Sequence, residues 1–409
     1  MNILFLTLSR LESVKDGGIY ADLIREFSKH GHKVYIVSPI ERRFNQETKI
    51  VRENNVSILV VKILNVTKTN LIEKGIGTLL IENQYFSAVK KHFSDIKFDL
   101  ILYSTPPITF TKLIKKIKYK YNTKSYLLLK DIFPQNAVDI ELFSKKSLFY
   151  KFFRKKEKKL YALSDFIGCM SPANVEYVTN HNPELNSEKV EVCPNSIEIK
   201  TDRNILNNQE ERKRQLGIPK ESTIFLYGGN LGKPQGIDFL YDILKSNESK
   251  EDRFFVIAGS GTEYNKVKKW FNEENFSNAL LLKSLPSKEY DNLVRLCDVG
   301  FILLDNRFTI PNYPSRLLSY LENKLPILAA TDVSTDIGKI AEANKYGFWC
   351  LNGDIDKFNF YLNKYVNNNN LIQNMGINGY NFFVDNYTVD KSYNIIMKHF
   401  KKDGILVNQ

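Results

Sequence analysis

Short apolar runs alternate with amphipathic stretches along most of the chain. The first part shows the pattern once: an apolar run at 2–8, apolar residues at helical spacing within 17–31, and a second apolar run at 32–39. Alternating strand-length and helix-length segments are typical of a parallel sheet with helices on both faces. The further runs that predict strands are 98–103, 125–130, 165–170, 190–194, 222–229, 253–259, 279–285, 299–304 and 325–330.

A polar segment between about 196 and 221 interrupts this alternation, and the pattern starts again after it. At 409 residues the chain is also too long for one ordinary core. The sequence therefore predicts an α/β protein with two Rossmann-like, doubly wound parallel-sheet domains, 1–198 and 199–385, followed by an amphipathic helix within 386–409. Ligands of such sheets bind at the carboxyl ends of the strands, so we expect the site in a cleft that the two domains face.

Composition narrows the class of protein. The four cysteines lie far apart without metal-ligand spacing, and the five histidines show no paired motif, so we expect reduced thiols and no zinc site. No apolar run approaches the roughly 18 residues of a membrane span. We expect the apolar start of the chain to be a first strand rather than a signal peptide, and the protein to be cytoplasmic. The net charge of +12 favours anionic partners.

The sequence GGNLGKPQG at 228–236 is the strongest candidate for a phosphate-binding loop. It follows a predicted strand and opens a predicted helix, where glycines allow close approach of the backbone and the helix N-terminus offers unpaired N–H groups. The alternative is a tight turn without a ligand. Gly17 and Gly18 stand before a predicted helix in the same way, and Gly259 begins a weaker GSG motif after a strand.

Arg316 opens another predicted helix. Pro314 and Ser315 suit a helix start, with Ser315 as a candidate N-cap. An arginine in the first turn opposes the helix dipole, which costs a little stability. This conflict suggests that Arg316 binds an anion; the alternative is a solvated surface arginine.

Further motifs stand in a fixed order around these loops. They are GHKV at 31–34, IEKGIGTLLIE at 72–82, YSTPPITF at 103–110, LLLKDIFPQNAVDI at 127–140, CPN at 193–195, FVIAGSGTEYNKVK at 255–268, LPSKEYDNLVRLCDVGFILL at 285–304 and YPSRLLSYLENKLPILAATD at 313–332. Together with the glycine-rich loops, this ordered set resembles the family 4 type of GT-B glycosyltransferases. Within that group it is most similar to the capsule and O-antigen N-acetylfucosaminyl transferases.

The resemblance implies an enzyme that transfers a sugar with retention of configuration and without a metal or other cofactor. The donor would be a nucleoside-diphosphate sugar, UDP-linked and carrying an N-acetylated deoxy-sugar, bound mostly by the C-terminal domain. The acceptor, bound by the N-terminal domain, would be a polyprenyl-diphosphate-linked glycan of capsule or O-antigen synthesis. The resemblance also implies that the helix within 386–409 crosses back to the N-terminal domain.

The same resemblance assigns roles to individual residues. Charge builds up on the leaving diphosphate in the transition state, so N–H groups and cations must meet it. Lys233 and Arg316 are the cations, while Gly17 and Gly18 approach the diphosphate from the other domain. The remaining donor-binding candidates are Gly229, Asn230, Gln235, Gly259, Pro314 and Ser315, with Ser284 and Leu285 beside the base.

The chain departs from the family at two places. Asn230 and Gln235 stand where the family has an arginine and a lysine. The family's pair of glutamates before the penultimate strand is also missing, because Pro311 and Ser319 occupy those positions. Glu322 lies about one helical turn after Ser319 and is either a substitute for the ribose contact or a surface glutamate.

Asp131 is the catalytic candidate of the N-terminal domain. It follows a predicted strand, at the end where wound sheets place functional groups. In the family a polar residue near this point often contacts the transferred sugar. The alternative is a turn cap ahead of Phe133 and Pro134. No second carboxylate is convincingly paired with Asp131 in the sequence, so a glycosidase mechanism lacks support.

Segment 143–161 combines eight lysines or arginines with interleaved aromatic residues. On a helix this pattern suits an anionic membrane interface, so we expect peripheral attachment to the inner face of the cell membrane, close to the lipid-linked acceptor. The alternative is a surface helix that packs its aromatics on the sheet. The candidate membrane and acceptor residues are Lys145, Lys146, Phe149, Phe152, Phe153, Arg154, Lys155 and Lys156.

Other functions remain as alternatives. A sugar-nucleotide epimerase of the same architecture would need paired acid and base groups near the sugar. A non-enzymatic sugar-nucleotide-binding assembly subunit is compatible with the missing glutamates. Nucleic-acid binding is disfavoured, because the chain lacks RRM and C2H2 patterns.

Overall fold

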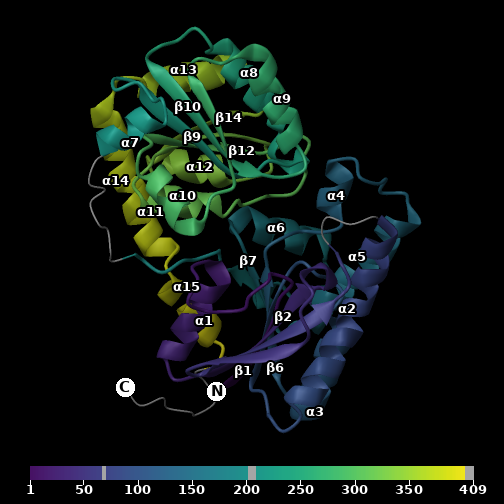
Figure 1. The fold of residues 1–409 in the computed structure, drawn as a ribbon. Coiled ribbons are helices and arrows are strands. Elements are labelled where there is room, and N and C mark those ends of the chain that lie inside the picture. The colour runs from purple at the N-terminus through teal and green to yellow at the C-terminus, as the bar shows by residue number, and fades with distance from the viewer. Residues whose placement is uncertain (67–70, 201–208, 401–409) are drawn as a thin grey trace. The chain divides into compact units, whose positions relative to one another are not determined.

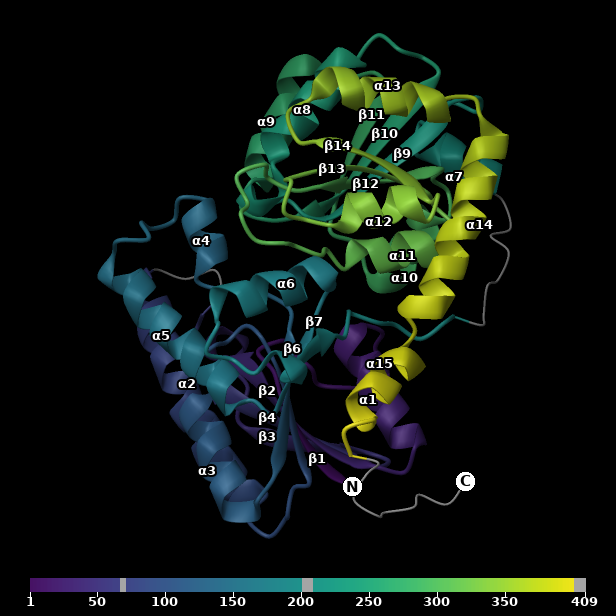
Figure 2. The ribbon, with the colours of Figure 1, turned by 180° about the vertical axis from the view of Figure 1, so that it is seen from behind.

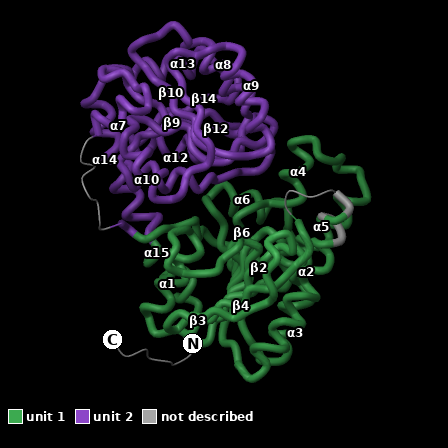
Figure 3. The backbone as a smooth tube through the Cα atoms, in the orientation of Figure 1, with its two compact units in different colours: residues 1–198, 389–409 green, residues 199–388 purple. Residues whose placement is uncertain are grey.

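The computed structural model describes residues 1–66, 71–200 and 209–400. The chain forms two compact units (Figure 3): unit 1 comprises Met1–Glu198 and the segment that begins at Val389, and unit 2 comprises Ile199–Thr388. Residues 401–409 of the predicted C-terminal segment lie outside the described residues, as do residues 201–208 of the polar segment. None of the described helices is long and apolar enough to cross a membrane.

Unit 1 is built on a mostly parallel sheet. Its strands are β1 (Asn2–Leu6), β2 (Lys33–Glu41), β3 (Lys49–Glu53), β4 (Val56–Ile63), β5 (Leu100–Ser104), β6 (Lys124–Leu129), β7 (Phe166–Cys169) and β8 (Val190–Val192). Their order across the sheet is β3-β4-β2-β1-β5-β6-β7-β8, and β3 pairs antiparallel with β4. From β1 the chain winds outward through β2 and β4 and then returns to the other side of β1 with β5. The topological switch point therefore lies between β1 and β5.

Helices cover both faces of this sheet, because its central strands are apolar on both sides. They are α1 (Ile19–Lys29), α2 (Leu71–His92), α3 (Thr111–Tyr121), α4 (Gln135–Asp139), α5 (Leu148–Leu163), α6 (Pro172–His181) and α15 (Val389–Met397). α1 and α15 lie on one face, and α2, α3 and α5 on the other (Figures 1 and 2). The core under α1 includes Phe27 and Leu128, and α15 adds Tyr393 and Ile396 to it. The Tyr393 hydroxyl also lies 3.0 Å from Nε2 of His32.

Unit 2 is built on a parallel sheet. Its strands are β9 (Thr223–Asn230), β10 (Arg253–Ser260), β11 (Ala279–Lys283), β12 (Val299–Leu303), β13 (Ile327–Thr331) and β14 (Gly347–Leu351). Their order is β11-β10-β9-β12-β13-β14, so the switch point lies between β9 and β12. The two sheets confirm the predicted α/β class with doubly wound parallel sheets.

Helices again cover both faces of the sheet in unit 2. They are α7 (Gln209–Gln215), α8 (Ile237–Ser246), α9 (Tyr264–Glu274), α10 (Ser287–Val294), α11 (Arg316–Glu322), α12 (Ile337–Ala343), α13 (Ile355–Tyr365) and α14 (Asn369–Asn386). α8, α9 and α13 lie on one face, and α10, α11 and α12 on the other (Figures 1 and 2). The buried aromatic rings of Phe225, Phe301 and Phe358 join β9, β12 and α13 in one core.

Candidate functional site

Three of the predicted loops emerge side by side at the carboxyl edge of the sheet in unit 2. Gly229 pairs with Gly259 across β9 and β10, and Gly259 pairs with Lys283 across β10 and β11. The predicted residues Ser284 and Leu285 follow β11 directly. The parallel register therefore brings the glycine-rich loop, the GSG motif and the predicted base-binding residues to one edge.

At the switch point, β9 and β12 stay paired over a short stretch. The pairs are Val299 with Phe225 and Gly300 with Leu226. Where this ladder ends, the Tyr320 hydroxyl accepts a hydrogen bond from the Gly228 N–H over 3.0 Å and donates one to the Leu226 carbonyl over 3.3 Å. Tyr320 thus satisfies the backbone at the point where wound sheets bind their ligands.

Arg316, the first residue of α11, reaches this point. Its guanidinium carbon lies 4.6 Å from the ring centre of Tyr227, and Nη2 donates a hydrogen bond to Oε1 of Gln235. Nη1 is buried and has no hydrogen-bond partner among the described residues. The interpretation of Arg316 as a solvated surface residue is therefore wrong.

The charge of Arg316 has no internal counter-ion in the part of the chain that the structure describes. Its hydrogen bond goes to a neutral amide, and its nearest ring is a tyrosine. A guanidinium keeps its charge in proteins, and a buried charge without an opposite charge is costly. The site therefore favours an anionic ligand beside Arg316.

The glycine-rich loop lies against this arginine. Gly229 has a φ of 117°, and a Cβ added there would lie 3.7 Å from the guanidinium carbon of Arg316. A Cβ added at Gly259 would lie 1.9 Å from the Gly229 carbonyl oxygen, so a side chain cannot fit at that position. Lys233 and Asn230 are exposed on the same loop. The backbone can thus approach a ligand closely here, with cations beside it.

The residues ahead of α11 differ in part from the prediction. Ser315 occupies the N-cap position, as expected, but its side chain makes no capping hydrogen bond. Ser315 is exposed and Pro314 is half-buried. Their predicted contact with the donor stays a prediction.

Glu322 ends α11 and is only 2% exposed, so it is not a surface glutamate. Its Oε1 accepts a hydrogen bond from the Lys200 N–H over 3.0 Å, and its Oε2 lies 3.7 Å from the Lys200 ammonium. These contacts tie α11 to the beginning of unit 2. The ribose contact remains an untested prediction for this residue.

In unit 1, Asp131 follows β6 at the carboxyl edge of the sheet. Its N–H donates to Thr105 Oγ1 over 3.2 Å, and its Oδ1 accepts from the Asn136 side chain over 3.2 Å. Burial raises the pKa of Asp131 to about 6, against the opposing effect of the Asn136 hydrogen bond. A carboxyl group with this pKa can change its protonation state near neutral pH, which suits a group that contacts a reacting sugar.

Gly17 and Gly18 lie at the start of α1 in the same unit. Both are exposed, and a Cβ added at either would meet no atom within 4 Å. The glycine at the N-cap position, Gly18, has a φ of 141°. This loop leaves the N-terminus of α1 open. Among the described residues, no group of three or more His, Cys, Asp or Glu side chains is placed to hold a metal ion.

The predicted membrane residues of unit 1 divide between two environments. Phe149 and Phe152 are 69% and 44% exposed, whereas Phe153 packs with its ring centre 5.0 Å from that of Phe133. Lys145, Lys146 and Lys155 are exposed, and Lys156 is half-buried. The alternative interpretation required the aromatic side chains of this helix to pack on the sheet. Phe149 and Phe152 do not do so.

Arg154 has a structural role in this region. Its Nη1 lies 2.7 Å from the Glu157 carboxylate, and its Nη2 donates to the His181 carbonyl and to Asn182 Oδ1 over 2.7 and 2.8 Å. These bonds join α5 to the end of α6. Arg154 consequently has few donors left for a headgroup.

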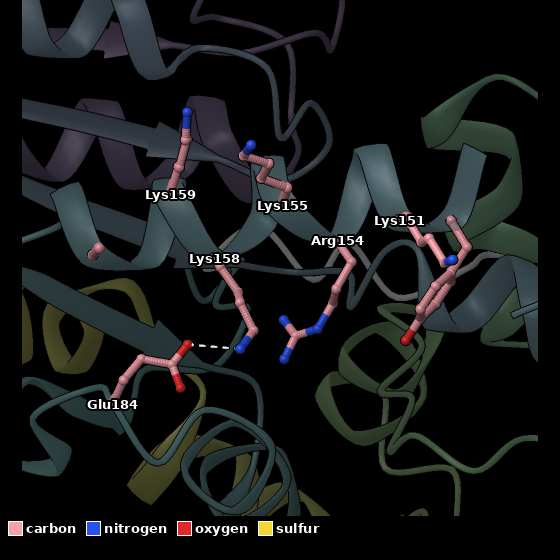
Figure 4. A pocket seen from close by; sticks show the side chains of 8 residues that line it. Lys151, Arg154, Lys155, Lys158, Lys159 and Glu184 are labelled. Carbon is pink, nitrogen blue, oxygen red and sulfur yellow. Dashed lines mark ion pairs between the residues drawn. The ribbon is translucent and has the colours of Figure 1, made fainter. Parts of the chain in front are cut away.

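The α5 groove, lined by Tyr150, Lys151, Arg154, Lys155, Lys158, Lys159, Ala162 and Glu184, has a volume of about 510 Å³. Figure 4 shows Lys158 turned toward Glu184, at an ion-pair distance of 2.9 Å. Lys155 and Lys159 project from α5 away from that carboxylate (Figure 4). The groove therefore presents a surplus of positive charge to the solvent.

Known proteins share this architecture. Residues 208–382 match the family described as glycosyl transferases group 1. A relative, the probable glycosyltransferase WbjE of Pseudomonas aeruginosa, is 23% identical over 292 residues, which cover 70% of each chain. Among solved structures, sucrose-phosphate synthase from Thermosynechococcus elongatus has a TM-score of 0.75 at 13% identity, with 98% of each chain covered. HepE from Anabaena, in complex with UDP and glucose, has a TM-score of 0.71 at 14% identity, covering 98% of this chain and 99% of that one.

The fold is GT-B. The matched segment spans most of unit 2, so that unit is similar to the glycosyl transferases group 1 family. In this GT-B protein the region around Arg316 contains residues that the sequence analysis missed. Tyr227 packs against the Arg316 guanidinium, and the Tyr320 hydroxyl bonds the backbone near the end of β9. Tyr290 covers Gly228, because a Cβ added at that glycine would lie 1.9 Å from the Tyr290 hydroxyl. Tyr320 stands four residues after Arg316 in the sequence, and this helical spacing could have pointed to it.

Proposed function

We propose that this chain is a retaining glycosyltransferase that uses a UDP-linked sugar as donor and a polyprenyl-diphosphate-linked glycan as acceptor. The observation that carries the proposal is the buried guanidinium of Arg316, which lies beside Gly229 and lacks a carboxylate partner among the described residues. A nucleoside diphosphate would supply the missing anion. Because the leaving diphosphate gains charge in the transition state, a fixed cation stabilises that state more than the bound donor.

Each side chain of the unit 2 site has a distinct role in this proposal. Arg316 binds the diphosphate, and Gln235 orients the guanidinium through its hydrogen bond. Lys233 is exposed on the same loop and supplies the second cation. Ser284 and Leu285, on the neighbouring loop, lie beside the base.

Three further points complete the proposal. A neighbour of the same fold was solved with UDP and glucose, which supports UDP as the nucleotide. The motifs at 72–82, 103–110 and 127–140 support an N-acetylated deoxy-sugar and a place in capsule or O-antigen synthesis. Asp131 contacts the transferred sugar, and the reaction needs neither a metal nor another cofactor, because the donor is itself a substrate.

Removing both cations tests the donor site. Lys233→Ala with Arg316→Ala should lower transfer from a UDP-sugar to a polyprenyl-diphosphate-linked acceptor by about 100-fold or more, because hydrogen bonds to charged groups contribute about 1.5–3 kcal/mol each. A matched control, Lys268→Ala with Arg214→Ala, removes two exposed charges of the same unit and should transfer like the wild type.

Transfer at the wild-type rate by the first variant, with circular dichroism showing a folded chain, would contradict the donor site. Isomerisation of the donor sugar without an acceptor would instead identify an epimerase. Donor binding without turnover on any lipid-linked acceptor would favour an assembly subunit.

The same enzyme would meet its acceptor at the inner face of the cell membrane. Leu148 is 82% exposed at the start of α5, next to the exposed Phe149. Lys151, Lys155 and Lys159 follow at four-residue intervals and line one side of the α5 groove. An apolar helix end with a cationic stripe behind it suits insertion into an anionic lipid surface.

Phe149→Ser with Phe152→Ser should reduce co-sedimentation with phosphatidylglycerol vesicles at least about fivefold, since each buried aromatic contributes about 1.5–3 kcal/mol. The control, Tyr119→Ser with Phe360→Ser, removes two rings that are 93% and 58% exposed elsewhere and should not change it. Wild-type protein that stays in the supernatant, or equal sedimentation of both variants, would refute attachment through α5.

A further inference from the structure

The loop between β12 and α11 leads directly into Arg316, the first residue of α11. Near the end of this loop, the Asn312 N–H donates a hydrogen bond to Thr335 Oγ1 over 3.0 Å. The next residue, Tyr313, reaches α14, where its hydroxyl lies 2.5 Å from the hydroxyl of Tyr387. Contacts from two different parts of unit 2 therefore fix the last residues before Arg316.

Tyr387 occupies a well-defined place at the end of α14. It is the C-cap residue of that helix and is only 5% exposed, and its N–H donates to the Phe383 carbonyl over 2.8 Å. Burial raises the pKa of both Tyr387 and Tyr313, so both hydroxyls stay protonated near neutral pH. Because a buried hydroxyl that loses its partner is costly, each hydroxyl stabilises the position of the other.

The same helix, α14, also packs on the far end of α11. A Cβ added at Gly376 would lie 2.1 Å from the Lys324 carbonyl oxygen, and a Cβ added at Gly379 would lie 2.8 Å from Cδ2 of Leu321. These two glycines therefore allow close packing of α14 against the C-terminal end of α11 and the residues that follow it. One helix thus fixes α11 at its end and, through Tyr387, the loop before its beginning.

We propose that Tyr387 is a positioning residue for Arg316, because through Tyr313 it fixes the loop that leads to the guanidinium. This inference rests on the proposed function, which brings the diphosphate of the donor to Arg316. A cation stabilises the charge of a diphosphate best when it is already in place before the ligand arrives. Loss of the contact between the two hydroxyls should therefore weaken the interaction of Arg316 with a diphosphate.

Calorimetric titration of the full chain with UDP and with uridine tests this role. Tyr387→Phe removes one hydroxyl and keeps the ring, and it should weaken UDP binding about fivefold or more. Uridine binding should stay unchanged, because uridine has no phosphate for Arg316 to bind. General damage to unit 2 would instead weaken the binding of both ligands.

A second background shows whether Tyr387 acts through the arginine. Arg316→Ala by itself should weaken UDP binding, and the addition of Tyr387→Phe should weaken it no further, because the group that Tyr387 positions is then absent. A further loss in this background would mean that Tyr387 affects the site by another route, which would overturn the inference.

Tyr346→Phe is the matched control. Tyr346 packs on Phe382, as Tyr387 does, with ring centres 5.2 and 5.4 Å from that ring. The Tyr346 hydroxyl is buried and has no hydrogen-bond partner among the described residues. Its removal should leave UDP binding as in the wild type.

Hydrogen exchange without a ligand reports on the loop itself. Tyr387→Phe should speed exchange of the amides within 312–318, and Tyr346→Phe should not. The inference is overturned if Tyr387→Phe binds UDP as the wild type does, if it weakens UDP and uridine equally, or if exchange in the loop is unchanged. A wild type that does not bind UDP would contradict the proposed function, and exchange in the loop would then decide whether Tyr387 fixes it.

Discussion

At the scale of single residues, Asp131 couples the stability of unit 1 to pH. Burial raises its pKa from the ordinary value of 3.8 to about 6. The folded protein therefore holds this proton more tightly than the unfolded chain does. Stability is lost as the pH rises from about 4 to about 6, and it is not regained at higher pH.

Asp131→Asn should make the protein more stable than the wild type at about pH 8, by up to about 3 kcal/mol, and by less at about pH 4.5. The amide oxygen of the new side chain can still accept the hydrogen bond from Asn136. Urea denaturation at the two pH values measures the difference, and the transfer assay should show reduced activity. A variant that is less stable than the wild type at the higher pH would contradict this account of Asp131.

The anion site could be predicted from sequence where neighbouring residues in the chain form a recognisable motif. The glycines of 228–236 and the arginine at a helix start both pointed to an anion site, and the structure brings Gly229 and Arg316 together. The hydrogen bond between Gln235 and Arg316 joins residues 81 positions apart, and no local pattern encodes such a contact. Tyr227 and Tyr290 were missed for the same reason, because their role depends on how the strands and helices pack.

At the scale of elements, α15 shows how a C-terminal helix completes the core of unit 1. Tyr393 stacks on His30, with ring centres 4.1 Å apart and planes 9° apart, and its hydroxyl meets His32. Ile396 is fully buried against the same sheet. The helix therefore belongs to the hydrophobic core of unit 1 rather than to its surface.

Ile396→Ala should lower the free energy of unfolding by about 2–5 kcal/mol, because it leaves a cavity in this core. Ile377→Ala removes an isoleucine that is 47% exposed on α14 and should cost much less. Urea denaturation of both variants gives the comparison. Equal losses would mean that α15 is not held by its buried face.

Some strands were harder to predict than others. The central strands of both sheets are continuous apolar runs, and these runs gave the expected strand positions. β3 has the mixed sequence KIVRE and lies at the edge of its sheet, where one side faces solvent. β4 and β14 also had no predicted counterpart, although VSILVVKI in β4 has the composition of a strand. The Tyr320 hydroxyl accepts a hydrogen bond from Gly228 where the β9–β12 ladder ends, and no pattern of apolar residues predicted this contact.

At the scale of the whole molecule, the GT-B fold and the similarity of unit 2 to the glycosyl transferases group 1 family fit the predicted class of protein. The wound topology could be predicted because parallel strands need crossover connections, and the alternating pattern supplied them. The net charge of +12 indicated anionic partners but not where they bind. The structure separates two positive regions by their surroundings: Arg316, whose Nη1 is buried, and the open α5 groove.

Hydrogen exchange with and without saturating UDP tests the central claim most directly, because it reports which backbone amides the nucleotide covers. The account predicts slower exchange in 228–236 and around Arg316, and no such protection in the variant with Lys233→Ala and Arg316→Ala. Exchange that is unchanged throughout unit 2 at saturating UDP would contradict the account.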